Sequence, residues 1–174
     1  MCALVTALAF VSAAACSDDT GTTGAAPSTT VAAPLGATST TTTIAITGDP
    51  VNQFTFVPGD CFNRYEVGTD VITTKVPCEG PHQREVYSTV NHPAPFGEPW
   101  PGDEALQRYG SRLCYQSFET FVGVIYELSE LGIGVLTPPR VNWEDARARY
   151  RGITCYLTRN DSRLLVGSMR GKAV

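Results

Sequence analysis

The strongest hydrophobic pattern in the chain predicts one long helix. Apolar residues recur at steps of three and four after Asp103, which we expect to cap the helix, and the pattern ends at Gly123, a residue type that commonly terminates helices. This apolar stripe consists of Leu106, Tyr109, Leu113, Phe118 and Phe121. We therefore expect an amphipathic helix that buries one face, with Cys114 at the edge of that face.

Four shorter stretches have the pattern of β-strands, because they are rich in β-branched residues or alternate polar with apolar positions. They are residues 71–76, 85–90, 153–157 and 164–166. The last two flank Asn160-Asp161-Ser162, which predicts a hairpin turn. Phe54 and Phe56 alternate before a turn and indicate an edge strand, whereas residues 143–149 are expected to form a short helical turn. The expected fold class is α+β, with a small antiparallel sheet packed on one main helix.

Residues 1–15 form an apolar leader that is too short to span a membrane, since a membrane-spanning helix needs about 20 residues. Small residues precede Cys16, and the run Ala13-Ala14-Ala15-Cys16 resembles a bacterial lipobox. We therefore predict a lipoprotein signal peptide over residues 1–15 and lipid attachment at Cys16. An ordinary secretory signal cut near Ala15 is the alternative, and both interpretations predict export.

Residues 16–53 lack the composition of a folded segment. After Cys16 they contain no aromatic residue and no cation, and Thr, Ser, Ala, Gly and Pro dominate. Such a segment cannot bury enough apolar surface to offset the entropy that ordering would cost, so we expect a flexible tether. The lipid and the tether would together hold a folded domain of residues 54–174 on the extracytoplasmic face of the cell membrane.

The expected folded domain contains four cysteines, Cys61, Cys78, Cys114 and Cys155. Widely spaced cysteines in an exported domain indicate two disulfides, and a zinc site would require paired ligands at C-x-x-C spacing, which the sequence lacks. Three pairings are possible. We favour Cys61 with Cys78 and Cys114 with Cys155, because each of these disulfides would join neighbouring segments.

The charge distribution by itself names no partner. The formal net charge is −4, and four of the 17 acidic residues precede Arg64, the first cation of the chain. From Arg64 onward, 13 acidic and 13 basic side chains balance. A balanced domain lacks the basic stripe that would neutralise several phosphates, so we expect no nucleic-acid partner.

Several short motifs follow one another in order along residues 56–171. They are Gly59-Asp60-Cys61-Phe62-Asn63, Val76-Pro77-Cys78, Pro81-His82, Glu85-Val86, Trp100-Pro101-Gly102, a cysteine-bearing helix with Phe118 and Gly123, and finally Trp143, Arg151, Cys155, Gly167-Ser168 and Gly171. This order resembles the septum formation domain of actinobacterial envelope lipoproteins. The resemblance implies a link with septum formation or cell division, and it implies no reaction. Where such domains often have Gly-Asp-Arg, this chain has Arg149-Tyr150-Arg151, so no role of that carboxylate is transferred.

His82, Glu85 and Ser168 are the residues from which a catalytic site could be built. His82 and Glu85 are metal-ligand types, but on one strand they would point to opposite faces. We expect His82 to hydrogen-bond to the backbone of a turn near Cys78, and Ser168, which lacks a Gly-x-Ser-x-Gly context, to lie in a turn. We therefore expect no catalytic residue, metal or cofactor, and we keep His82 and Glu85 as possible binding residues.

The other candidate binding residues are arginines and tryptophans. If Arg147, Arg151 and Arg163 share a face, they could bind an anionic wall polymer, a lipid headgroup or an acidic partner. A solvated face with internal ion pairs is the alternative. Trp100 and Trp143 could either contact a partner or pack internally.

The sequence thus predicts a non-catalytic, lipid-anchored extracytoplasmic domain. Its expected partner is an envelope or divisome protein or a wall polymer, with a possible link to septum formation or cell division. The alternatives are an extracytoplasmic cell-wall hydrolase, which would use His82 with Glu85 or Ser168, and a sensor of a small ligand.

Overall fold

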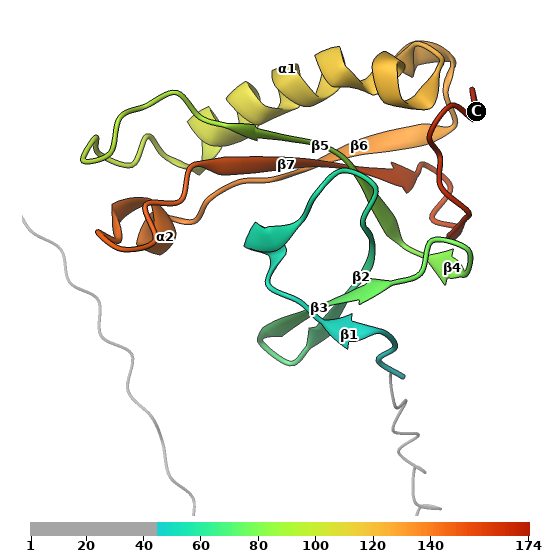
Figure 1. The fold of residues 1–174 in the computed structure, drawn as a ribbon, viewed down its shortest axis with the longest axis horizontal. Helices are drawn as coiled ribbons and strands as arrows, with labels where there is room; N and C mark the ends of the chain where they lie inside the picture. Colours follow the sequence, from blue (N-terminus) through green and yellow to red (C-terminus); the bar gives the residue numbers. More distant parts are fainter. Residues whose placement is uncertain (1–44) are drawn as a thin grey trace, which may run out of the picture. The chain divides into compact units, whose positions relative to one another are not determined.

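The structure is a computed structural model, and it describes residues 45–174. Its centre is an antiparallel sheet of six strands in the order β1-β3-β2-β5-β7-β6 (Figure 1), and a second sheet pairs β4 with β8. The strands are β1 (Asp49–Pro50), β2 (Cys61–Val67), β3 (Asp70–Val76), β4 (Pro81–His82), β5 (Arg84–Asn91), β6 (Leu131–Leu136), β7 (Gly152–Arg159) and β8 (Leu165–Val166). The predicted α+β class is confirmed.

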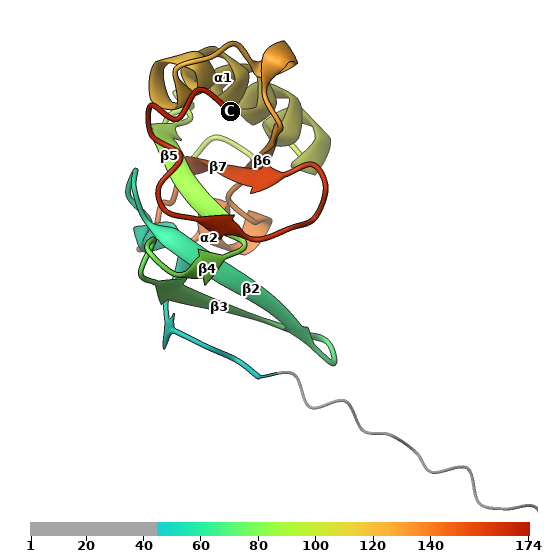
Figure 2. The same cartoon turned by 90° about the vertical axis from the view of Figure 1, so that its right-hand side faces the viewer.

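One long helix, α1 (Asp103–Val122), lies across β5, β7 and β6 (Figures 1 and 2). The predicted helix is therefore confirmed, as is its end at Gly123, whose backbone is left-handed (φ 91°) and whose N–H donates to the Glu119 carbonyl. The predicted cap is wrong by one residue. Gly102 caps the helix, and Asp103 is its first residue, where the carboxylate lies near the positive end of the helix dipole.

The larger of two hydrophobic clusters lies between α1 and the sheet. Gly110 permits close approach of the helix, because a Cβ there would lie 2.7 Å from Cγ1 of Val135 on β6. Complete burial of one large apolar side chain stabilises a fold by about 1.5–3 kcal/mol, so this layer holds the helix on the sheet. Its central residues are Tyr87, Cys114, Phe118, Phe121, Val122, Leu131, Cys155 and Leu157.

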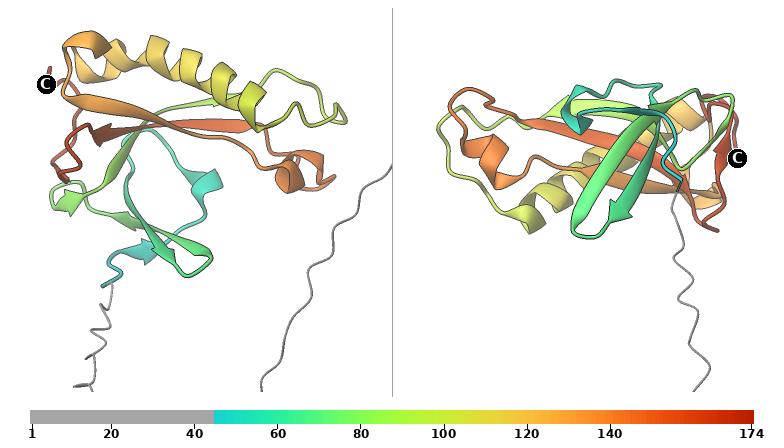
Figure 3. Two further views of the ribbon diagram at one scale, coloured as in Figure 1. Left: turned by 180° about the vertical axis from the view of Figure 1, so that it is seen from behind. Right: turned by 90° about the horizontal axis from the view of Figure 1, so that it is seen from below.

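The hairpin of β2 and β3 belongs to the half of the sheet that lies away from α1 (Figure 3). The sequence did not predict β2, because Asn63, Arg64 and Glu66 interrupt its apolar pattern. The structure explains the polar residue at position 63, since the buried Asn63 side chain accepts a hydrogen bond from the Gln83 N–H at 2.8 Å. A smaller cluster of Phe56, Phe62 and Val86 completes the core.

Both predicted disulfides are present. Cys61 and Cys78, 17 residues apart, join β2 to the turn after β3, and Cys114 and Cys155, 41 residues apart, join α1 to β7. On the chain-entropy model, loops of these lengths stabilise the fold by about 3 and about 4 kcal/mol. The second disulfide therefore ties together the two elements that enclose the larger cluster.

Two predicted local features near the ends of the domain are wrong. Phe54 lies in a 3-10 helix, η1 (Gln53–Thr55), because the side chain of Asn52 accepts the Phe54 N–H and caps that turn. β8 pairs with β4 instead of forming a hairpin with β7. In the intervening turn, Ser162 has a left-handed backbone (φ 63°), and the chain leaves the main sheet after β7.

The chain between α1 and β7 contains two elements that the sequence did not predict and one helical turn with bounds other than those predicted. The stretch after Gly123 forms a 3-10 helix, η2 (Tyr126–Leu128), and then β6. The helical turn predicted for residues 143–149 is instead α2 (Arg140–Glu144), which ends earlier because the Asp145 side chain accepts the N–H groups of Arg147 and Ala148.

The predicted signal peptide, Cys16 and most of the predicted tether lie outside the described residues. Ahead of the predicted start of the domain at residue 54, β1 already belongs to the main sheet, where Asp49 pairs with Lys75 of β3. Within residues 45–174, no helix has both the length and the apolar character that crossing a membrane requires.

Candidate functional site

At one end of the domain the loop after β5 faces the segment between α2 and β7 (Figure 1). Residues of both segments line a cleft there. Trp143 joins the two walls, since it is buried and its Nε1 donates to the Glu98 carbonyl at 2.9 Å. His92 packs against Trp143 and against Tyr109 of α1, with ring centroids 5.2 and 4.6 Å away. We call this site the Arg151 cleft, and its principal residues are His92, Phe96, Trp143, Arg149 and Arg151.

Arg151 is the buried cation of the cleft, with 5% of its surface exposed. Its Nη1 donates to the carbonyls of Trp143 (2.8 Å) and Tyr150 (3.2 Å), and its Nη2 donates to the Pro95 carbonyl at 3.3 Å. The guanidinium lies 3.8 Å from the centre of the Trp143 ring. Among residues 45–174, Arg151 forms no ion pair, and its buried Nε has no hydrogen-bond partner.

Two hollows lie beside this guanidinium. The larger, about 530 Å³, is bounded by Trp143, Glu144 and Asp145, and the smaller, about 290 Å³, is bounded by His92, Ala148 and Tyr150. Phe96, Arg149 and Arg151 line both hollows. The lining of the smaller hollow contains two arginines and no acidic residue, so it is the more electropositive of the two.

Phe96 and Arg149 form the accessible part of the cleft. Phe96 is 61% exposed, which is unusual for a large aromatic side chain, and the guanidinium groups of Arg149 and Arg151 lie 5.6 and 5.5 Å from its ring centre. Arg149 has a left-handed backbone (φ 44°), a conformation that is strained for a residue other than glycine. This turn places a second cation beside Arg151.

Two of the three acidic residues that line the larger hollow have partners, and the third is Glu98. Glu144 pairs with Arg140 at 3.0 Å on the exposed side of α2. The backbone N–H groups of Ala148 and Arg147 donate to the Asp145 carboxylate, and these hydrogen bonds lower the pKa of Asp145. Neither carboxylate forms an ion pair with Arg151, although all three residues line the same hollow.

His92 is held in its neutral form by the cleft. Burial lowers its pKa below the ordinary 6.5, and the positive charge of Arg151 lowers it further. The Ala94 N–H lies 3.2 Å from Nδ1 of His92, which therefore accepts a hydrogen bond and carries no proton. Protonation would break this bond and add a cation next to Arg151.

Glu85 and Ser168, two of the three residues considered for catalysis, are in direct contact. The Ser168 hydroxyl donates to Oε1 of Glu85 at 2.5 Å, and the Met169 N–H donates to Oε2 at 2.7 Å. Glu85 is completely buried, and both of its oxygens accept hydrogen bonds from the C-terminal segment. This arrangement makes Glu85 an internal anchor for that segment.

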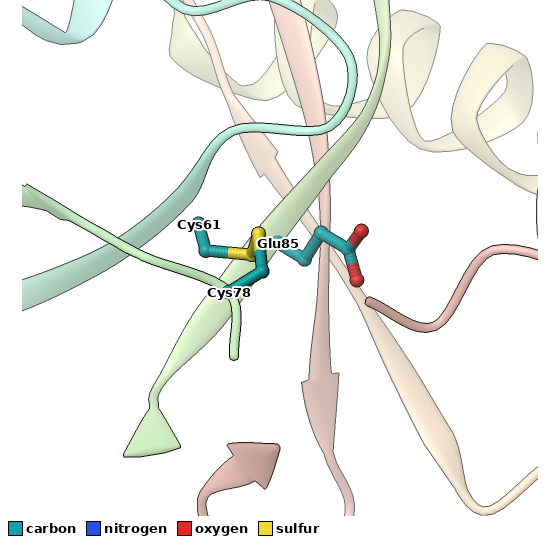
Figure 4. Close-up of side chains that lie close together, drawn as sticks. All are labelled: Cys61, Cys78 and Glu85. Carbon is teal, nitrogen blue, oxygen red and sulfur yellow. A yellow bond between two sulfur atoms is a disulfide. The ribbon is translucent and has the colours of Figure 1, made fainter. Parts of the chain in front are cut away.

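The disulfide between Cys61 and Cys78 lies next to Glu85 (Figure 4). A carboxylate oxygen and the two sulfur atoms lie within 4.8 Å of one another, but the sulfurs are bonded to each other and the carboxylate points away from them. His82 lies in β4, is completely buried, and its Nδ1 is 2.9 Å from the Gly80 carbonyl. This is the backbone contact in a turn that the sequence led us to expect.

The arginines singled out in the sequence do not form one group. Arg163 follows the end of β7, whereas Arg151 precedes its start, and the eight residues of β7 extend about 26 Å. Arg163 pairs with Asp161 at 2.6 Å. Arg147 is exposed in the turn after α2, and Trp100 is half-buried with an Nε1 that has no partner within residues 45–174.

Sequence reasoning missed Phe96 and Arg149. Phe96 lies in a proline-rich loop, and only its exposure in the folded domain distinguishes it from a core aromatic residue. The position of Arg149 depends on a left-handed backbone that its residue type does not indicate. An exposed aromatic residue between prolines and a nearby pair of arginines would have been the available signal.

Comparison with known proteins identifies a family. The model of a family described as septum formation matches residues 30–144, and it matches again over residues 58–173. The second match covers all the principal residues of the Arg151 cleft and both disulfides. No curated protein and no solved structure matched the chain.

Proposed function

This chain belongs to the septum formation family, and from that premise we propose that its folded domain is a non-catalytic binding domain that acts outside the cytoplasm in septum formation. Its partner is another protein of the envelope or division machinery, or a polymer of the cell wall. The Arg151 cleft is the proposed binding site.

The observation that carries this proposal is the buried, unpaired charge of Arg151 beside an exposed aromatic ring. A buried cation without a carboxylate partner costs free energy, and an acidic group from a partner would offset part of that cost. The smaller hollow, which has no acidic residue in its lining, is the position for that group. Phe96 supplies an exposed aromatic contact of the kind that typically dominates binding energy at an interface, and the buried Trp143 holds the Arg151 guanidinium in place.

The location outside the cytoplasm is supported by two disulfides, which are rare in reducing compartments. The apolar leader and Cys16 support lipid attachment, and the composition of residues 16–53 supports a tether. A membrane fraction prepared from native cells tests this part. The wild-type protein should be retained there and Cys16→Ala released, whereas an intact cytosolic chain with free thiols would refute the proposed location.

A hydrolase is the competing function, and the short Ser168–Glu85 contact is the observation that would favour it. A nucleophile needs an adjacent base and access to substrate, whereas both oxygens of the buried Glu85 are occupied and His82 bonds to the backbone. The larger hollow, about 530 Å³, is also of a size that holds small ligands, which a ligand-dependent thermal shift would reveal.

The proposed binding function is tested by complementation of a strain that lacks this protein. We expect the double variant Phe96→Ala, Arg149→Ala to be exported and folded, because both side chains are exposed, and yet to leave the septation defect uncorrected. The matched control is Arg140→Ala, Val141→Ala, which removes the same kinds of side chain from α2 outside the cleft, and it should restore septation.

Two results would overturn the proposal. Full complementation by the cleft variant would show that the Arg151 cleft binds no essential partner. Release of soluble fragments from isolated cell walls by the purified protein would indicate a hydrolase, provided that Ser168→Ala stopped the release while retaining a folded, oxidised domain.

A further inference from the structure

A further hollow lies at the opposite end of β7 from the Arg151 cleft, and four arginines line it. It measures about 330 Å³, and we call it the arginine hollow. Arg64 comes from β2, Arg84 from β5, Arg159 from the end of β7 and Arg163 from the following turn. None of the residues that line it is acidic.

The arginine hollow carries an excess of positive charge. Arg159 and Arg163 pair with Asp161, and Arg159 also pairs with Glu130. These contacts raise the pKa of Arg159 and lower the pKa of Asp161, so both of these groups stay charged at neutral pH. Arg64 and Arg84 form no ion pair within residues 45–174, which leaves two cations for a ligand.

Two side chains that line the hollow, Gln83 and Arg84, are held in place before any ligand binds. The Arg84 guanidinium lies 5.6 Å from the centre of the Tyr156 ring, and its Nη1 donates to Oε1 of Gln83 at 2.8 Å. The same oxygen accepts the backbone N–H of Arg64 at 2.8 Å. Gln83 therefore directs its amide oxygen to the protein and keeps its NH₂ group available, so less entropy is lost when a ligand binds.

Two residues with hydroxyl groups, Thr158 and Ser162, also line the hollow, and Ser162 has a left-handed backbone (φ 63°). Planar guanidinium groups that donate in pairs, together with hydroxyl and amide donors, match the several oxygens of a phosphate group.

We propose that the arginine hollow binds a phosphate group. The same chemistry is presented by free phosphate compounds and by the headgroups of anionic lipids, both of which carry phosphate oxygens. This inference is independent of the Arg151 cleft, because the two sites share no lining residue.

The test uses the full chain with Cys16→Ser, purified with both disulfides formed. Titration calorimetry with inorganic pyrophosphate measures the free phosphate source, and co-sedimentation with phosphatidylglycerol vesicles, against phosphatidylcholine vesicles, measures the lipid source. We expect binding in at least one arm. The double variant Arg64→Gln, Arg84→Gln should weaken it about tenfold or more, since it removes two charge-assisted donor groups.

The matched control removes the same charge elsewhere. Arg108→Gln, Arg140→Gln neutralises two exposed arginines that pair with Glu104 and Glu144 and should leave binding within about twofold, since it removes no donor from the hollow. If the control weakens binding as much as the hollow variant, the attraction is non-specific and the proposal fails. It also fails if neither pyrophosphate nor phosphatidylglycerol vesicles bind.

Loss of folding is separated from loss of binding by a second variant. Arg64→Lys, Arg84→Lys retains both charges but lacks the planar fork, and it should bind with an affinity between those of the wild type and the Gln variant. Each variant is compared with wild type by thermal unfolding and by thiol titration. Unchanged affinity in a folded Gln variant would overturn the proposal.

Discussion

The two ends of β7 contain arginines in opposite environments. At the start, Arg151 is 5% exposed and bonds to backbone carbonyls and to an aromatic ring. At the other end, Arg159 and Arg163 bond to carboxylates near the solvent. The buried arginine has lost its hydration and joins two loops, whereas exposed ion pairs contribute little because water and salt screen them.

This difference shows why a count of arginines in the sequence is a poor guide to function. Arg151, Arg159 and Arg163 lie within one short segment of the chain. Arg151 bonds to backbone carbonyls, whereas the other two bond to carboxylates. Arg151 therefore stabilises the fold in addition to its proposed role in binding. Arg159 and Arg163 contribute mainly positive charge to the surface. Four predictions test this contrast between the two ends of β7.

The largest expected effect is on stability when Arg151 is replaced. Arg151→Ala should lower the free energy of unfolding by about 3 kcal/mol, because three carbonyls lose a charged donor and Trp143 loses its stacked partner. Urea unfolding measures this loss, and Arg163→Ala is the control at the other end, where we expect no measurable change. If Arg151→Ala unfolded at the same urea concentration as the wild type, the proposed difference between the two ends of β7 would be contradicted.

Relief of backbone strain should have the next largest effect, and at both ends. Arg149→Gly and Ser162→Gly each place glycine at a left-handed position (φ 44° and 63°), which should raise the free energy of unfolding by up to about 1 kcal/mol after the entropy of the unfolded chain is counted. Chemical denaturation tests both. Of the two, Arg149→Gly should also weaken partner binding at the Arg151 cleft. Destabilisation by both substitutions would contradict this prediction.

A smaller effect is expected from pH at the Arg151 cleft. The unfolded chain protonates His92 near pH 6.5, and the folded domain protonates it only at lower pH because its pKa is lowered by burial and by Arg151. The unfolded state then binds more protons, so this stabilisation is present above pH 6.5 and is lost as the pH falls below it. Thermal unfolding from pH 7.5 to 5 should show a loss that His92→Gln reduces. An identical slope in the variant would exclude His92 as the cause.

The smallest effect is expected at Asp161. Hydrogen bonds from Arg159, and then from Arg163, lower its pKa from the ordinary 3.8, so its contribution is present above that pH and is lost as the pH falls through its folded value. Because the group is exposed, Asp161→Asn should barely move the thermal midpoint at pH 7, and added salt should remove what difference there is. A large shift of the thermal midpoint that salt does not remove would mean that the ion pairs of Asp161 stabilise the fold as much as the contacts of Arg151 do.

Particular elements show how much of the fold the sequence could predict. Helix α1 was predictable because its apolar stripe repeats with the helical period, and β5 and β7 because they alternate or are rich in β-branched residues. β2 was not, because the polar Asn63 is buried against a backbone group 20 residues away. β8 was assigned to the wrong partner, since its two residues pair with β4 and local turn chemistry does not specify that contact.

The candidate site was predictable only in part. Trp143 and Arg151 were chosen for their residue types, and the structure places them in contact within one cleft. Phe96 and Arg149 were missed because exposure and a left-handed backbone are properties of the folded chain. Ser168 and Glu85 were considered as catalytic residues, but their contact spans 83 residues of chain and anchors the C-terminal segment instead.

The sequence by itself determined the long helix, the α+β class, the four cysteines with their favoured pairing, and the resemblance to a family. These properties depend on local periodicity, composition and the order of short motifs. Only the tertiary structure decided that Arg151 is buried while Arg163 is exposed, and that Pro95 lies beside a guanidinium 56 residues further along the chain. The physical reason is that burial and distant contacts depend on the path of the whole chain, which no local pattern encodes.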